Sequence, residues 1–142
     1  MEVQLVASLT ARAPRLVLIT EGTVSAGWPS PADDYLEQPI DLSERLIPRP
    51  AATFLVRASG NSMEGAGISD GDELVVDRSL TPRDGQIVIA VVDGSFLVKT
   101  LRTRGIGAPK LVAEHPGYPE MSLAGREVQM WGVVTYVLHQ AP

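Results

Sequence analysis

The sequence predicts a mostly β protein, folded as curled antiparallel sheets or a partly open barrel, with an extended N-terminal arm. From residue 53 onward, short apolar segments recur at close intervals, and dipeptides typical of tight turns separate them. Before residue 53, five prolines between residues 29 and 50 exclude a long regular helix. We therefore expect three parts: a cleavable arm at 1–26, a proline-rich connector at 27–52 and a β-domain at 53–142.

The expected strands follow from alternating or continuous apolar residues. They lie at Phe54–Ser59, Glu73–Asp77, Gln86–Val92, Ser95–Arg102, Lys110–Glu114 and Glu127–Leu138. The turn signals between them are Asp70-Gly71, Asp84-Gly85, Asp93-Gly94 and His115-Pro116-Gly117. In the connector, "SPADDYLEQ" is expected to form a short helix, with Ser30 as N-cap and Pro31 as the first helical residue. The apolar strand at the C-terminus is suited to the core or to a dimer surface, and the core is favoured.

Composition excludes several classes of function. A net charge of −5 and a pI near 4.9 give no electrostatic footprint for nucleic acid, so direct DNA binding is not expected. The chain has no cysteine, which removes disulfides and thiolate nucleophiles, and no ligand cluster for a metal or cofactor stands out. The longest apolar runs are too short to span a membrane and the N-terminus lacks the pattern of a signal peptide, so a cytoplasmic location is expected.

The stretch from Val56 to Val76 contains a candidate nucleophile. Gly60-Asn61-Ser62-Met63 follows a strand, where a tight turn can expose a serine hydroxyl and direct backbone N–H groups toward an oxyanion. The backbone amides of Ser62 and Asn61 are the candidate donors. The alternative is that Ser62 caps an ordinary turn leaving the strand.

Lys99 is the candidate base. In "FLVKTLR" the alternation of a strand puts Lys99 on the same face as Leu97 and Leu101. A lysine acts as a base only when its amine is neutral, and burial among apolar side chains favours that form. The alternative is an amine that reaches water while its stem covers apolar surface. His115 and His139 are expected to be exposed loop and tail residues.

Two of these segments resemble a known family. "ASGNSMEGAGISDGDELVVDR" and "GQIVIAVVDGSFLVKTLR" are similar to the self-cleaving serine peptidases of the LexA and UmuD family, whose fold is also related to signal peptidases. In that family the serine of the S-G-x-S-M motif is the nucleophile and a lysine in a later strand is the base. The resemblance implies these roles for Ser62 and Lys99, which are 37 positions apart.

The resemblance also implies the substrate, which is a bond in the chain's own N-terminal segment between a small residue and glycine. Ala26-Gly27 fits, and "WPSPADDYLEQPIDLSERLI" after it resembles the corresponding segment of UmuD. UmuD commonly has cysteine where this chain has alanine, a difference between two small residues that we expect to be harmless. A repressor of this family has a helix-turn-helix domain before the cleavage site, for which 26 residues leave no room, so a UmuD-like protein is favoured.

For a UmuD-like protein, the resemblance implies a homodimer that takes part in the SOS response to DNA damage. A RecA filament on single-stranded DNA stimulates cleavage in cis or in trans, and the product serves a UmuC-like Y-family polymerase in error-prone translesion synthesis. Two alternatives remain open at this point. One is a non-catalytic β-fold binding module, and the other is the C-terminal domain of a LexA-type repressor.

Overall fold

The computed structural model of the protein describes residues 1–8, 16–17 and 39–142. Contacts within the chain group Met1–Thr10 with Arg49–Pro142 in one unit and Ala11–Pro48 in a second. The predicted division at residues 26 and 52 stays a prediction, but the first residues of the predicted arm form a strand of the β-domain. The predicted helix beginning at Ser30 lies outside the described residues.

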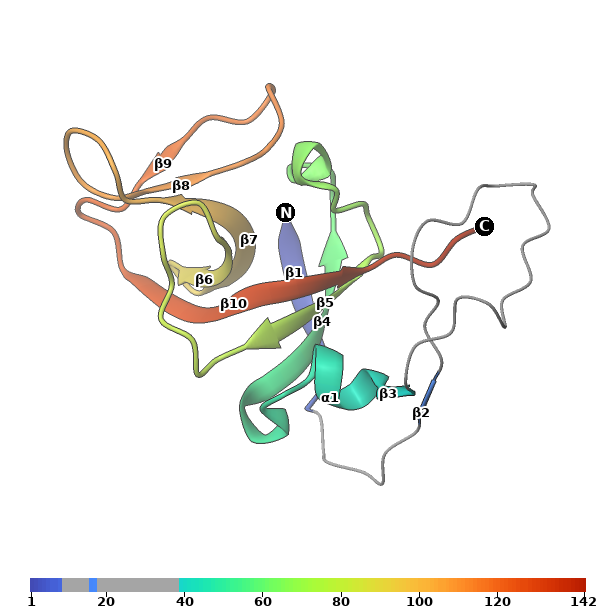
Figure 1. The fold of residues 1–142 in the computed structure, drawn as a ribbon. Helices are drawn as coiled ribbons and strands as arrows, with labels where there is room; N and C mark the ends of the chain where they lie inside the picture. The colour runs from blue at the N-terminus through green and yellow to red at the C-terminus, as the bar shows by residue number, and fades with distance from the viewer. Residues whose placement is uncertain (9–15, 18–38) are drawn as a thin grey trace. The chain divides into compact units, whose positions relative to one another are not determined.

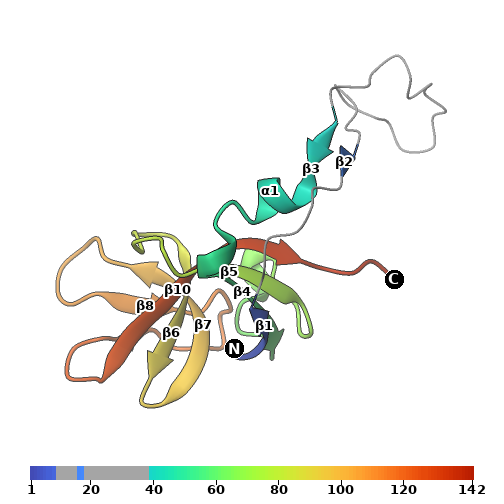
Figure 2. The same cartoon turned by 90° about the horizontal axis from the view of Figure 1, so that it is seen from below.

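The larger unit is built on one antiparallel sheet (Figures 1 and 2). Its strand order is β1-β4-β5-β10-β6-β7-β8-β9, and an additional pairing of β1 with β7 closes the first six into a barrel. The bounds are β1 Glu2–Ser8, β4 Thr53–Ser59, β5 Glu73–Asp77, β6 Ile87–Val92, β7 Ser95–Arg102, β8 Lys110–Val112, β9 Met121–Ser122 and β10 Val128–Leu138. The mostly β prediction is confirmed. The barrel is closed rather than partly open, because β1 bridges β4 and β7.

All six predicted strands are present, with bounds that differ by at most two residues from the expected ones. The turn at Asp93-Gly94 shows why the prediction succeeds locally. Both residues have positive φ, 48° and 85°, as a two-residue type I′ hairpin requires, and Val92 pairs with Ser95 across the turn. The strands β1 and β9 were not predicted.

The smaller unit contains a short two-stranded sheet of β2 (Leu16–Val17) and β3 (Ile40–Asp41), followed by helix α1 (Leu42–Leu46). Asp41 is the N-cap of α1, and its carboxylate accepts a hydrogen bond from the Ser43 amide at 3.0 Å. A one-turn 3-10 helix at Pro50–Ala52 precedes β4 in the larger unit.

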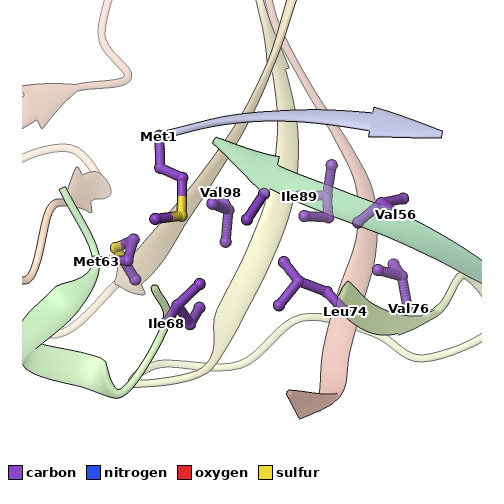
Figure 3. Close-up of a cluster of buried hydrophobic side chains, with 9 residues drawn as sticks. Met1, Val56, Met63, Ile68, Leu74, Val76, Ile89 and Val98 are labelled. Carbon is purple, nitrogen blue, oxygen red and sulfur yellow. The ribbon is translucent and has the colours of Figure 1, made fainter. Parts of the chain in front are cut away.

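Two clusters of buried side chains form the core of the barrel unit. The first contains Met1, Val56, Ala58, Met63, Ile68, Leu74, Val76, Ile89 and Val98, and Figure 3 shows their side chains converging between the strands. The second contains Val88, Ala90, Val92, Leu101, Leu111 and Val133. Strand β10 is buried at Gly132 and Val133, where it lies between β5 and β6, and exposed at Tyr136 and Leu138. The favoured core role therefore holds fully in the middle of β10. On either side of it, other residues are partly buried against the two clusters: Val128, Met130, Trp131, Val134 and Val137.

Asp77, at the end of β5, is a buried carboxylate with three hydrogen bonds. It is 2% exposed and accepts from Arg49 Nε at 2.6 Å, from Ser79 Oγ at 2.6 Å and from the Ser79 amide at 2.8 Å. Burial alone would raise the pKa of Asp77, but Ser79 and then Arg49 outweigh it and lower the pKa below the usual 3.8.

We expect Asp77→Asn to lower the free energy of unfolding by about 2 kcal/mol at pH 7, because an amide cannot replace the ionised acceptor. Because the folded-state pKa is depressed, the carboxylate stabilises the fold above pH 3.8, and this contribution is lost as the pH falls through the lower folded value. Urea unfolding at pH 7 and pH 3 should show a smaller difference between variant and wild type at pH 3. Asp93→Asn, at an exposed turn carboxylate, is the matched control. A pH-independent difference would contradict the account.

Candidate active site

Ser62 lies in the connection from β4 to β5, three residues after β4 ends, and is only 1% exposed. Gly60 makes the turn out of the strand with φ of 97°, a conformation that favours glycine. Met63 is fully buried in the first core cluster and is followed by a one-turn 3-10 helix at Glu64–Ala66. The hydroxyl is therefore fixed between a strand end and a side chain anchored in the core.

The acidic turn after Ser62 holds this connection in place. The Asp70 carboxylate accepts from the Gly60 amide at 2.7 Å, and the Asp72 carboxylate accepts from the Ser69 amide at 2.8 Å. The other Asp72 oxygen is 2.6 Å from His139 Nδ1. Burial alone would raise the pKa of Asp72, but the Ser69 amide and the His139 ring outweigh it and lower the pKa. The turn predicted at Asp70-Gly71 is present, with the Asp72 amide donating to the Ser69 carbonyl oxygen at 3.1 Å, and its carboxylates also anchor the loop that carries Ser62.

A close contact between Gly65 and Glu114 also holds the loop that carries Ser62. The Gly65 amide donates to the Glu114 carbonyl oxygen at 2.8 Å, and a Cβ added at Gly65 would lie only 2.6 Å from that oxygen. Only glycine lets the two backbones come this near without a shift. Glycine at position 65 thus links the Ser62 connection to Glu114, two residues after the end of β8.

Lys99 reaches Ser62 from β7. Its residue is 8% exposed, and Nζ donates to Ser62 Oγ at 3.3 Å in a buried hydrogen bond. Leu97 and Leu101, on the same face of the strand, are half-buried and buried. Of the two alternatives left open by the sequence, the structure favours the amine held inside the protein over the amine that reaches water.

Two aromatic rings, those of Tyr118 and His115, complete the surroundings of Ser62 and Lys99, and sequence reasoning assigned neither to the site. The Tyr118 ring centroid is 5.5 Å from Lys99 Nζ, and its hydroxyl donates to Asn61 Oδ1 at 2.7 Å. The His115 ring, half-buried rather than exposed, packs edge-on against Tyr118 with centroids 5.3 Å apart. Tyr118 therefore touches both the base candidate and the neighbour of the nucleophile candidate.

Met1 lies next to Ser62 and Lys99. The Met1 amino group donates to Ser62 Oγ at 2.5 Å, and the Met1 carbonyl accepts from the Val98 amide at 2.9 Å. Burial and then the neighbouring Lys99 amine lower the pKa of the Met1 amino group from 8.0 to about 6, although Glu2 opposes this. The site thus holds two amines around one hydroxyl.

Comparison with known proteins gives the family. A family model described as Peptidase S24-like matches residues 18–135. The chain belongs to the Peptidase S24-like family. It is 50% identical to protein ImpA of Salmonella typhimurium over 115 residues, which covers 81% of this chain and 78% of that relative. It is 43% identical to protein MucA of Escherichia coli over 121 residues, covering 84% and 82%.

These relatives are UmuD-like proteins of the LexA and UmuD family, so the resemblance found in the sequence is confirmed. A LexA repressor of Halorhodospira halophila is 37% identical over 127 residues, but the match covers only 55% of that relative against 88% of this chain. The family indicates a serine peptidase of the LexA and UmuD type, and the UmuD-like relatives indicate a protein of SOS mutagenesis.

The Peptidase S24-like fold thus brings together Ser62, Lys99 and Asn61 of the predicted site residues. The predicted cleavage residues, Ala26 and Gly27, lie outside the described part of the chain. The roles of the Ser62 and Asn61 amides as oxyanion donors stay predictions. Within residues 1–8, 16–17 and 39–142, no group of three or more His, Asp or Glu side chains is arranged to hold a metal ion. In the same residues no helix is long and apolar enough to span a membrane.

Proposed function

We propose that the chain is a UmuD-like SOS-response protein that cleaves itself between Ala26 and Gly27 through a Ser62/Lys99 dyad. The observation that carries this proposal is the buried hydrogen bond between Lys99 Nζ and Ser62 Oγ. A Ser-Lys peptidase needs the lysine amine within hydrogen-bond reach of the serine hydroxyl, and these two groups meet this need although they are 37 positions apart in the sequence. The Peptidase S24-like family supports the same reaction class.

In the proposed reaction, neutral Lys99 takes the Ser62 proton while Oγ attacks the Ala26 carbonyl carbon. The Ser62 and Asn61 amides hold the oxyanion, and protonated Lys99 then gives its proton to the Gly27 nitrogen as the peptide bond breaks. The product is an ester between Ser62 and Ala26. A water molecule then gives a proton to Lys99 as its oxygen attacks the ester carbonyl carbon. Lys99 passes that proton to Ser62 Oγ as the ester bond breaks, which restores the hydroxyl, and the Ala26 carboxylic acid leaves and loses its proton to solvent.

The partners of this function follow the family. We propose a homodimer whose cleavage a RecA filament on single-stranded DNA stimulates, and whose shortened product is the accessory subunit of a UmuC-like Y-family polymerase in translesion synthesis. The net charge of −5 supports access to DNA through these proteins rather than by direct binding. The scissile bond and the active site belong to one chain, so holding the bond beside Ser62 supplies much of the rate. A regulator then acts by changing how often the bond reaches Ser62.

The test is incubation of the purified protein at neutral pH with RecA, ATP and single-stranded DNA, followed by intact-mass measurement. We expect fragments of residues 1–26 and 27–142 from wild type, none from Ser62→Ala, and a slower reaction without RecA. A wild type that stays intact under these conditions and at high pH would favour the non-catalytic binding module instead.

Tyr118 offers a graded test of how the site is positioned. We expect Tyr118→Ala to slow cleavage by about 10- to 100-fold, because the ring against Lys99 and the hydrogen bond to Asn61 are both lost. Tyr118→Phe keeps the ring, so its rate should fall by less than about tenfold. Equal rates for Tyr118→Ala and wild type would show that this side chain does not position the dyad.

A further inference from the structure

Strand β1 occupies a slot between two other strands of the barrel. It pairs antiparallel with β4 from Glu2↔Ser59 to Ser8↔Phe54, and with β7 at Glu2↔Leu97. The Val98 amide donates to the Met1 carbonyl on the β7 side. In Figures 1 and 2, β1 lies alongside β4 with the N-terminus pointing toward the loop that follows β4. Without β1, the facing edges of β4 and β7 would be unpaired.

The end of this slot lies next to Ser62 and Lys99. Strand β4 ends three residues before Ser62, and β7 carries Lys99 two residues beyond the Leu97 pairing. Met1 is 8% exposed as a whole residue, and its side chain packs with Met63 and Val98, as Figure 3 shows. Because Met1 is in hydrogen-bond contact with Ser62 Oγ, it fills the space beside the nucleophile that an incoming carbonyl group needs.

Beyond Met1, few buried side chains hold β1. Leu5 is 55% exposed and Val6 41% exposed, and Glu2, Gln4 and Ala7 are exposed as well. The pairing with β4 is also interrupted by a register shift between Leu5 and Ala7. The strand is therefore held mainly by main-chain hydrogen bonds, which any extended peptide can supply equally well.

We propose that the edge of β4 beside Ser62 is a binding site for an extended peptide strand, and that β1 fills this site and blocks cleavage until it is displaced. The displacing occupant is the segment around the scissile bond, in which Thr23-Val24 supplies β-branched, strand-forming residues. This inference rests on the proposed function for its substrate. It adds that the first eight residues inhibit the reaction, so that loosening β1 is the step that activates it.

A reversible lock on β1 tests the proposal. Gln4 and Arg57 face each other across β1 and β4 and are both exposed, and the chain has no cysteine of its own. Opposed positions on antiparallel strands have the Cα spacing that a disulfide needs. The variant is Gln4→Cys with Arg57→Cys, oxidised to hold β1 in place. Samples are reduced after quenching, so that a cut chain separates before its mass is measured.

We expect the oxidised protein to cleave at least about tenfold more slowly than the same protein kept reduced, with recovery on adding reductant. The matched control is Lys110→Cys with Ser122→Cys, a facing pair on β8 and β9, whose oxidation should leave the rate unchanged. Equal rates for the oxidised and reduced Gln4/Arg57 pair would overturn the proposal.

A binding measurement separates this inference from the proposed function. In a Ser62→Ala background, a fluorescent peptide of residues 21–30 should bind the reduced protein and not the oxidised one. If the peptide binds only the reduced protein, and the protein with Ser62 intact cleaves in neither the reduced nor the oxidised state, the strand-binding site is supported and the self-cleavage proposal fails. A peptide that binds both forms equally, or neither, would overturn the strand site.

Discussion

Replacing Lys99 with alanine is expected to reduce the rate of self-cleavage by about 10⁴-fold, the loss typical of removing one member of a catalytic unit. The Ser62 hydroxyl is a weak nucleophile without a base, and the Lys99 amine at 3.3 Å is the group positioned to take its proton. Ser62→Ala should lose as much activity, and the double variant should lose no more than either single variant. The fraction of intact chain, followed by mass over time, measures all three rates.

The chain offers a matched control because Lys110 is its other lysine. Lys110 lies on β8 and forms an exposed ion pair with Glu120 at 3.0 Å. Lys110→Ala should cleave at the wild-type rate. Lys99→Met retains the volume of the stem and should be as inactive as Lys99→Ala with an unchanged melting temperature. A Lys99→Met protein that retains activity would show that the amine is not the base.

Met63→Ala should give the largest loss of stability among the variants considered, about 3 kcal/mol within the range of 2–5 known for buried methionine. Met63 is fully buried in the first core cluster and shares it with buried residues from four strands, β4, β5, β6 and β7. Truncation leaves a cavity next to Ser62, so the cleavage rate should fall as well. Urea unfolding at pH 7 measures the change in free energy.

Met121→Ala is the comparison for that experiment. Met121 is half-buried on β9 and packs against the edge of the second cluster, so its truncation should cost about 1 kcal/mol or less. A Met63→Ala protein as stable as Met121→Ala would contradict the assignment of Met63 as an anchor of the nucleophile loop.

Local signals account for what the sequence predicted correctly. The strands β4 to β7 and β10 follow from alternation and turn chemistry within a few residues, and Asp93-Gly94 is the clearest case. The pair of Ser62 and Lys99 emerged because two motifs agreed in order and spacing with a known family. Without that family, the local sequence fits equally well a Ser62 that caps a turn and a Lys99 whose amine reaches water.

Non-local contacts account for what the sequence did not predict. Strand β1 pairs with a segment about 50 residues away, and its exposed side chains carry little periodic signal. Tyr118 donates a hydrogen bond to Asn61, which is 57 positions away in the sequence. The residues around Tyr118 predict a turn, but nothing in them indicates this contact. The turn at Asp70-Gly71 was predicted, but the contacts of the Asp70 and Asp72 carboxylates, which anchor the nucleophile loop, were not.

The most direct test of the self-cleavage account is the intact mass of wild type and Ser62→Ala after incubation alone at pH 10, where lysine amines are more often neutral. The account predicts fragments of residues 1–26 and 27–142 from wild type and an intact Ser62→Ala chain. Fragments that form equally in Ser62→Ala, or a wild-type cut at a bond other than Ala26–Gly27, would contradict it.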